Sequence, residues 1–231
     1  MNQANLTLLE LFRLGGIFMW PLLFFSIATI AISLERAIYL IYHNLSLEGL
    51  REKLDEFLKE GKLDEARKWL TDLASRRMGA RVLLSLLDRA ASEKDGKSVD
   101  PVLLEHRLEK TVEAEAATSI NSLENGFNFL TALGSISPLT GFLGTVSGMI
   151  GAFRSIAEAV DVNAQIVANG IYEALITTVF GLIIAIIAMV AHSLFSHVVD
   201  KFAGNLEMVC SDLIFELANG QYSESNYPEK K

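Results

Sequence analysis

Apolar residues in this chain gather in three long runs that contain no Asp, Glu, Lys or Arg. These uncharged runs cover residues 14–34, 125–153 and 174–199, which are 21, 29 and 26 residues long. A helix needs about 20 mainly apolar residues to cross the hydrocarbon core of a bilayer. Each run satisfies this length, so the pattern predicts three membrane-spanning helices rather than one soluble globule.

The first run predicts a retained span over residues 15–41 and not a removable secretory signal. Glu10 lies where a signal would be positively charged, and the apolar run is longer than the core of a signal. Pro21 is tolerated near the start, because the first turn of a helix lacks intrahelical hydrogen-bond partners. Glu35 and Arg36 follow the run and are expected to lie at the membrane edge.

The charged segment between the first and second runs predicts a helical insert. Residues 43–124 hold 14 of the 20 Lys and Arg and 17 of the 28 Asp and Glu. Apolar residues at helical spacing predict amphipathic helices, with a loop after them; the helices cover 48–59, 63–74 and 79–90 and the loop covers 92–98.

A further helix start follows this loop. Asp100 precedes Pro101, which is a favourable N-cap followed by proline at the first helical position. No stop signal appears before Gly126, so we expect one helix to run from residue 101 to residue 157 and to enter the second span.

The distribution of Lys and Arg sets the orientation. The insert side and the C-terminal tail carry 18 of these residues, whereas the N-terminal segment and the turn between the second and third spans carry 2. Because Lys and Arg favour the cytoplasmic side, the N-terminus is expected outside and the insert and tail inside. The predicted layout is an outer N-terminus (1–14), a first transmembrane helix (15–41), a cytoplasmic helical insert (42–125), a second transmembrane helix (126–153), an outer turn (154–162), a third transmembrane helix (163–197) and a cytoplasmic C-terminal helix and tail (198–231).

This layout predicts an all-α membrane protein whose long helices extend into the cytoplasm. Several other classes are disfavoured by composition. The net charge of −8 and the absence of a basic stripe argue against nucleic-acid binding. Cys210 is the single cysteine, which excludes an internal disulfide and a thiolate metal cluster, and the four histidines lack metal-ligand spacing. No metal site is therefore expected.

Two of the predicted spans have one face of small and hydroxyl-bearing residues and an opposite face of bulky ones. In the second span the small face includes Ser137, Pro138, Thr140, Gly141, Gly144, Thr145 and Gly148. In the third span it includes Glu173, Thr177, Thr178, Gly181 and Ala185, with Ile184 as a bulky exception and Ile176 on the opposite, outward face. Such faces permit close helix packing or line a polar path, and both interpretations stay open.

Glu173 requires an explanation, because an acidic residue near mid-bilayer costs at least about 2.5–3.5 kcal/mol unless it faces protein or water. Counted from the outer ends of their helices, Glu173 and Thr145 lie about 16 and 18 Å deep, at matching levels. Together with Thr177 and Thr178, they are candidates for a polar layer on an ion path. A structural acid that is protonated or hydrogen-bonded between helices is the alternative for Glu173.

The sequence of the second span from Ser137 to Met149, SPLTGFLGTVSGM, resembles the signature of the ExbB/TolQ/MotA proton-channel family. The third span from Gly170 to Ala185, GIYEALITTVFGLIIA, resembles the same family, and the ALITT string and the Glu35–Arg36 exit are closer to ExbB. Ile187 stands where many relatives have proline, which predicts a straighter third helix.

This resemblance implies a pentamer in the bacterial inner membrane, with a periplasmic N-terminus, a cytoplasmic C-terminus and membrane lipid around it. It implies an ExbD-like single-span partner whose aspartate carries protons, a TonB-like protein that receives the work, and no cofactor apart from protons as the coupling ion. Carried over by position, Thr145 and Thr178 are pore-facing hydroxyls, and Glu173 is the acid near them. The remaining small residues would serve helix packing and partner contact.

Other functions stay open at this point. A TolQ-like or other stator subunit of the same family and a passive scaffold without ion flux are alternatives. A flagellar-stator-like or sodium-coupled relative is disfavoured, because that branch typically has four spans. An intramembrane protease is disfavoured, because Glu173 is the one acid within the spans and His192 lacks a catalytic mate. We therefore expect no enzymatic activity.

Overall fold

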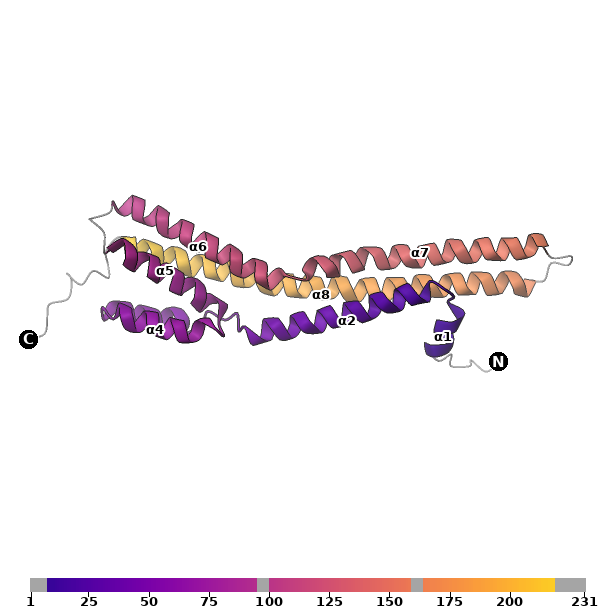
Figure 1. The fold of residues 1–231 in the computed structure, drawn as a ribbon, viewed down its shortest axis with the longest axis horizontal. Coiled ribbons are helices and arrows are strands. Elements are labelled where there is room, and N and C mark those ends of the chain that lie inside the picture. The colour runs from indigo at the N-terminus through magenta and orange to yellow at the C-terminus, as the bar shows by residue number, and fades with distance from the viewer. Residues whose placement is uncertain (1–7, 95–99, 159–163, 219–231) are drawn as a thin grey trace, which may run out of the picture. The chain divides into compact units, whose positions relative to one another are not determined.

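A computed structural model describes residues 8–94, 100–158 and 164–218, and within these ranges the chain is helical and has no strand. The helices are α1 (Leu8–Leu14), α2 (Met19–Tyr42), α3 (Leu50–Lys59), α4 (Leu63–Ala74), α5 (Met78–Lys94), α6 (Pro101–Glu124), α7 (Phe127–Glu158) and α8 (Ala164–Ala218) (Figure 1). Three stretches of the described residues are long and apolar enough to cross a membrane: Met19–Tyr42, one within Pro101–Glu158 and one within Gly170–Ala218. The predicted all-α membrane protein is confirmed.

The chain divides into two compact units, which we describe separately. The first unit, the membrane unit, contains residues 1–36 and 126–195. The second unit, the insert unit, contains residues 37–125 and 196–231. Helices α2 and α8 contribute residues to both units.

In the membrane unit, α7 and the first half of α8 run in opposite directions and approach closely through glycines (Figure 1). A Cβ atom built on Gly141 would lie 2.8 Å from the carbonyl oxygen of Thr177, and one on Gly181 would lie 2.6 Å from that of Ser137. Either distance is too short for a real contact, so no side chain fits between the two backbones at these points. The close packing of α7 against α8 therefore requires small residues at these positions.

Helix α2 covers a different face of α8. Met19 and Leu22 of α2 pack with Ile176 and Ile184 of α8 in one buried cluster. The prediction that Ile176 faces outward is therefore wrong, because its side chain is 7% exposed and is covered by the N-terminal helices. Ile184, the bulky residue on the small face of α8, is likewise buried in the cluster with α2.

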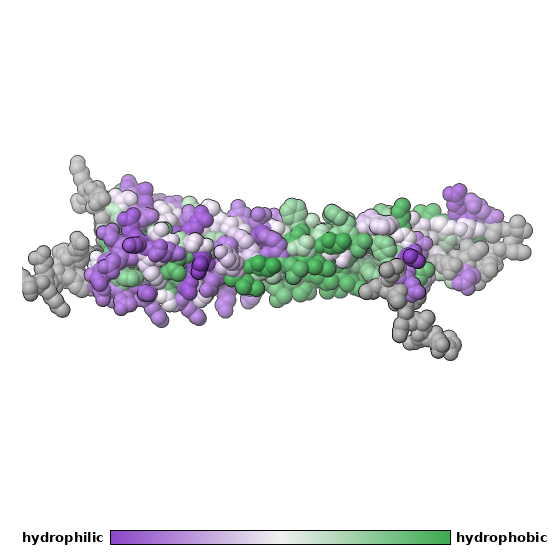
Figure 2. Space-filling view, turned by 60° about the horizontal axis from the view of Figure 1, so that its bottom comes forward, coloured by the Kyte–Doolittle hydropathy of each residue, from purple (hydrophilic) through white to green (hydrophobic). Residues whose placement is uncertain are grey.

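The outer surface of the membrane unit is apolar. Figure 2 shows a green surface over this unit and a mostly purple surface over the insert unit. The large exposed side chains include Leu23, Phe24, Ile27 and Ile30 of α2, Leu139, Phe142, Met149 and Ile150 of α7, and Leu175, Val179, Leu182 and Ile186 of α8. A surface of this kind suits contact with lipid chains.

The expected unbroken helix from residue 101 into the second span is in fact two helices. Helix α6 ends at Glu124, and α7 begins at Phe127. Between them Asn125 has an extended ψ of 129°, and Gly126 has a φ of +91°, which L-residues with a side chain rarely adopt. An isolated glycine in a helical pattern is often tolerated, which is why the sequence did not reveal this break.

Other boundaries differ less from expectation. Helix α8 passes through Ile187 without interruption. Residues 154–158 of the predicted outer turn belong to α7, and the rest of that turn lies outside the described residues, as do residues 1–7 and 219–231. Helix α5 continues to Lys94, so the predicted loop begins later than expected, and most of it also lies outside the described residues.

The insert unit contains the predicted amphipathic helices. Helices α3, α4 and α5 form where leucines recur at helical spacing, and Leu54, Leu58, Leu70 and Leu83 are completely buried. The predicted start of α6 is confirmed, because the Asp100 side chain accepts a hydrogen bond from the Val102 backbone N–H at 3.1 Å. The apolar stripes of these helices thus form a core of their own.

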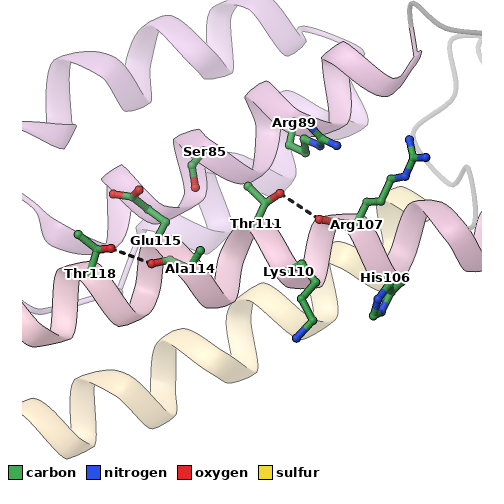
Figure 3. Close-up of a pocket in the computed structure, with 9 residues that line it drawn as sticks. All are labelled: Ser85, Arg89, His106, Arg107, Lys110, Thr111, Ala114, Glu115 and Thr118. Atoms are coloured by element: carbon green, nitrogen blue, oxygen red, sulfur yellow. Dashed lines mark hydrogen bonds between the residues drawn. The ribbon is translucent and has the colours of Figure 1, made fainter.

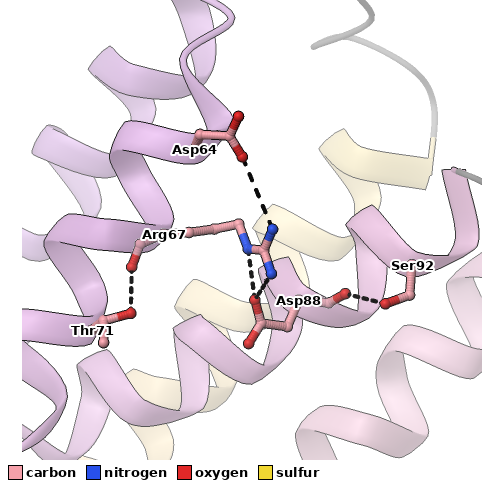
Figure 4. Close-up of polar contacts among 5 residues, drawn as sticks. All are labelled: Asp64, Arg67, Thr71, Asp88 and Ser92. Atoms are coloured by element: carbon pink, nitrogen blue, oxygen red, sulfur yellow. Dashed lines mark hydrogen bonds and ion pairs between the residues drawn. The ribbon is translucent and has the colours of Figure 1, made fainter.

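Ion pairs connect the helices of the insert unit. Arg67 of α4 donates to the Asp88 carboxylate of α5, with Nε at 2.7 Å and Nη2 at 2.6 Å (Figure 4). Arg51 of α3 pairs with Asp212 and Glu216 of α8. Burial lowers the pKa of Arg51, but its hydrogen bond to Asp212 and the nearby carboxylate charges raise the pKa above its ordinary value.

We expect Gly181→Ala to destabilise the protein by roughly 1–3 kcal/mol, because the added methyl group would overlap the Ser137 carbonyl and force α7 and α8 apart. The matched control is Gly151→Ala in α7, where a Cβ meets no atom within 4 Å among the described residues. Alanine is the better helix former, so the control should be neutral or stabilising by up to about 1 kcal/mol. Thermal unfolding in detergent measures both, and equal effects would contradict the close-packing explanation.

Candidate ion-pathway site

The candidate site lies where α7 and α8 meet around Gly141. Thr177 is 1% exposed, and its hydroxyl lies within hydrogen-bonding distance of the Ala174 carbonyl at 2.8 Å and of the Gly141 carbonyl at 3.2 Å. The Gly144 position also lies directly against the Thr177 side chain. Thr177, which was predicted to line an ion path, is thus enclosed between the two helices of one chain.

Thr178 and Thr145 lie at the edge of this contact and are partly exposed. The Thr178 hydroxyl donates to the Gly141 carbonyl at 3.2 Å, and the Thr145 hydroxyl donates to the Phe142 carbonyl at 2.6 Å. In an α-helix the carbonyl of Gly141 also accepts the backbone N–H of Thr145. One carbonyl group therefore connects the two threonines that were predicted to act together.

The hydroxyls of Thr145 and Thr178 keep hydrogen-bonding capacity for a ligand. Each uses its hydrogen on a backbone carbonyl, which leaves lone pairs that accept from another donor. Rotation of the side chain would free the hydrogen for an anionic acceptor instead. The pair is thus able to serve both a protonated and an ionised acid next to it.

Glu173 is half-buried and lies against the glycines that separate α1 from α2. Its carboxylate occupies the space directly beside Gly16, so a Cβ atom there would collide with Oε1. Gly16 has a φ of +66°, which suits glycine alone without strain. The sequence analysis did not find this contact, although the Gly15–Gly16 pair before the first span was a visible signal.

The residues predicted for helix packing are mostly buried in the same interface. Ser137 is completely buried and donates to the Leu133 carbonyl at 2.6 Å. Gly141, Gly144, Gly181 and Ala185 are also buried, whereas Pro138 and Gly148 are partly exposed. The small face of α7 is therefore largely covered by the small face of α8 within one chain.

Glu35 and Arg36, which were predicted to lie at the membrane edge, form an ion pair with each other. Arg36 is hydrogen-bonded to the Glu35 carboxylate through Nε and Nη2, and its side chain is 10% exposed. The Arg36 stem lies 3.4 Å from the Cβ position of Gly126, at the break between α6 and α7. Next to that break, the Phe127 ring lies 5.8 Å from the His192 ring.

A pocket of about 550 Å³ in the insert unit lies between α5 and α6 (Figure 3). Its cations are already paired: Arg89 and Arg107 contact Glu93 at 2.7 and 2.8 Å. The hydrogen bond between Lys110 and Glu113 raises the pKa of Lys110 and lowers that of Glu113. This pocket therefore lacks a cluster of available positive charge for an anionic ligand.

A second hollow, of about 620 Å³, lies between α6 and the C-terminal half of α8. Glu105, Glu109 and Glu113 border it, and Leu206 and Cys210 belong to its lining. Burial raises the pKa of the Cys210 thiol to about 12, so the thiol is protonated at neutral pH and is a poor nucleophile. Neither hollow of the insert unit presents a catalytic arrangement among the described residues.

Known proteins with similar sequences fall in one group. The model of the MotA/TolQ/ExbB proton channel family matches residues 80–208, which is more than half of the chain. The biopolymer transport protein ExbB of Salmonella typhimurium is 28% identical over 191 residues, which cover 82% of this chain and 75% of the relative. The biopolymer transport protein exbB1 of Vibrio cholerae is 28% identical over 200 residues, covering 83% and 80%.

The Tol-Pal system protein TolQ of Haemophilus influenzae is 46% identical over a shorter stretch of 74 residues, 32% of each chain. The matched residues 80–208 include α7, the first part of α8 and the threonines described above. The family match and the geometry therefore concern the same helices. The chain belongs to the MotA/TolQ/ExbB proton channel family.

Proposed function

We propose that this chain is an ExbB-like subunit of a motor in the bacterial inner membrane that is driven by the proton-motive force. Five copies would surround the helices of an ExbD-like single-span partner and pass the work to a TonB-like protein for outer-membrane transport. The N-terminus would be periplasmic and the C-terminus cytoplasmic. The observation that carries the proposal is the pair of partly exposed threonines on facing helices: the Thr178 hydroxyl donates to the Gly141 carbonyl, and the Thr145 hydroxyl donates to the Phe142 carbonyl one residue further along α7.

The chemistry of a membrane aspartate supports this assignment. An ionised carboxylate in a region of low dielectric constant needs hydrogen-bond donors, and a protonated one needs acceptors. The two threonine hydroxyls offer either function by rotating away from or toward the Gly141 and Phe142 carbonyls. A partner helix that carries the proton would thus meet matching groups in both of its charge states.

The available energy is sufficient for movement of a weakly held partner helix. Each proton that crosses a potential of 100 mV releases about 2.3 kcal/mol. The glycine-mediated contacts hold α7 and α8 together within one subunit. We therefore expect the subunit to stay rigid during transport, while the partner moves against the Thr145 and Thr178 edge.

The branch of the family is assigned on the extent of similarity. Similarity to the ExbB proteins of Salmonella typhimurium and Vibrio cholerae covers about four-fifths of the chain, whereas the TolQ proteins of Haemophilus influenzae and Pseudomonas aeruginosa match 32% and 42% of it at higher identity. A TolQ-like function in the Tol-Pal system is the second candidate because of that local identity. Restoration of growth in strains that lack either ExbB or TolQ separates the two, since each function supports a different phenotype.

The basic test is proton flux in vesicles that contain the full chain and the single-span protein encoded beside it. A potassium diffusion potential should acidify or alkalinise the vesicle interior only when both proteins are present. An assembled complex without any pH change would contradict the proposal and favour a passive scaffold.

We expect Thr178→Val to reduce this flux about tenfold or more while the complex still assembles. Valine keeps the volume but removes the hydroxyl, and a hydrogen bond to a charged group contributes about 1.5–3 kcal/mol. The matched control is Thr140→Val, because the Thr140 hydroxyl donates to Ile136 of its own helix at 3.0 Å. Equal flux in both variants would remove Thr178 from the path.

We expect Gly16→Ala to reduce flux as well, because the new methyl group displaces the Glu173 carboxylate. The matched control is Gly49→Ala in the insert unit. Gly49 has a similar φ of +72°, but a Cβ there meets no atom within 4 Å among the described residues. Both variants should lose roughly 1–2 kcal/mol of stability from backbone strain, and Gly16→Ala should lose more. Unchanged flux in Gly16→Ala would show that proton transfer does not depend on the position of Glu173.

A further inference from the structure

Helix α2 has a polar seam that the proposed ion path does not use. The inward residues of α2 in the membrane unit recur at alternating spacings of three and four: Met19, Leu22, Ser26, Thr29, Ser33 and Arg36. The first two are apolar, and the rest are hydroxyl-bearing or charged. We call the last part, Thr29, Ser33 and Arg36, the α2 seam.

The α2 seam lies on the side of α2 that faces the rest of the membrane unit, where Thr29 and Arg36 are buried and Ser33 is partly exposed. On the N-terminal side of the seam, Met19 and Leu22 pack against Ile176 and Ile184 of α8. At the C-terminal end of the seam, Arg36 lies against Gly126, just before α7. The side chains between these two contacts share their face of α2, so they lie between α2 and the α7–α8 pair. Thr29 is accordingly 1% exposed.

The two hydroxyls of the seam differ from six other hydroxyls of the membrane unit. The hydroxyls of Thr131, Ser135, Ser137, Thr140, Thr145 and Thr177 donate to a carbonyl three or four residues earlier in their own helix. The Thr29 and Ser33 oxygens are buried and meet no hydrogen-bond partner among the described residues. Both hydroxyls thus lack the intrahelical hydrogen bond that these six residues make.

A buried polar group without a partner is costly, and water commonly satisfies such groups in protein interiors. Thr29 and Ser33 are one helical turn apart on one face of α2, so their Cβ atoms are separated by about 5–6 Å. Side-chain rotation can bring the two oxygens to about 4.5–5 Å, a separation that one water oxygen spans with two hydrogen bonds of about 2.8 Å. We propose that the α2 seam binds water between Thr29 and Ser33, inside each subunit.

This site has a consequence for the membrane unit that does not depend on the proposed motor function. Arg36 lies about 5 Å further along the helix axis than Ser33, at the membrane edge. Bound water would therefore extend a polar route from the middle of α2 to Arg36, and it would make the contact between α2 and the α7–α8 pair partly wet. The site can exist whether or not the chain conducts protons.

The first test compares the thermal stability of Thr29→Val with that of Thr177→Val in the full chain. If water bridges the seam, Thr29→Val removes one hydrogen-bond partner of the water and should lower Tm by roughly 2–4 °C. Thr177→Val should lower Tm by a similar amount, because it removes the Thr177 hydrogen bonds. If the seam is dry, valine removes an unsatisfied hydroxyl at constant volume, and Tm stays the same or rises. That second result overturns the proposal.

The second test detects the water directly in the unmodified sequence. Solid-state NMR of the protein in lipid vesicles, with ¹³C-labelled threonine and serine, measures magnetisation transfer from water to each side chain. Thr29 and Ser33 should both receive it, and Thr29 should receive it much faster than Thr177, which is equally buried at 1% exposure. Transfer as slow as that of Thr177 overturns the proposal, even if Thr29→Val lowers Tm, because Thr29 would then have a dry structural role.

Discussion

The close approach of α7 and α8 is the constraint on which the membrane unit depends. In a bilayer, apolar side chains gain little by leaving lipid for protein, so helices associate where backbones come close and polar groups find partners. Gly141 and Gly181 permit that approach, and the Thr177 hydroxyl lies within reach of the Gly141 carbonyl across it. A larger residue at either glycine would remove both effects at once. The small residues are therefore explained by packing within one chain before any pore is considered.

The other face of α8 follows from this arrangement. With Ala174 and Thr177 directed at α7, Ile176 and Ile184 are left to be covered by α2, and Glu173 is directed at the glycine junction before α2. The contact with Gly16 gives the Glu173 carboxylate a protein neighbour on one side, which lowers the free-energy cost of an acid within a bilayer. The Glu173 carboxylate can occupy this position only because Gly16 has no side chain there.

The sequence predicted features that depend on local pattern. Run length predicted the spans, leucine spacing predicted the helices of the insert, and the Asp100–Pro101 pair predicted the start of α6. Which neighbouring helix covers a given face of a span could not be predicted from these local patterns. A helical wheel separates Ile176 from Thr177, but it does not reveal that α2 covers Ile176. The break at Gly126 escaped prediction because a lone glycine in a helical pattern does not reveal that its φ is +91°, nor that the Arg36 side chain lies beside it.

The position of a residue around its helix determines whether its hydroxyl is accessible more than its depth along the helix does. Thr177 and Thr178 are adjacent and share a level, yet Thr177 is enclosed and Thr178 is partly exposed. Of the hydroxyls expected to form one polar layer, only Thr145 and Thr178 remain open to a second protein. Gly141 and Gly144, which lie beside them, are covered by α8, so the small residues at this level are used for packing within the chain.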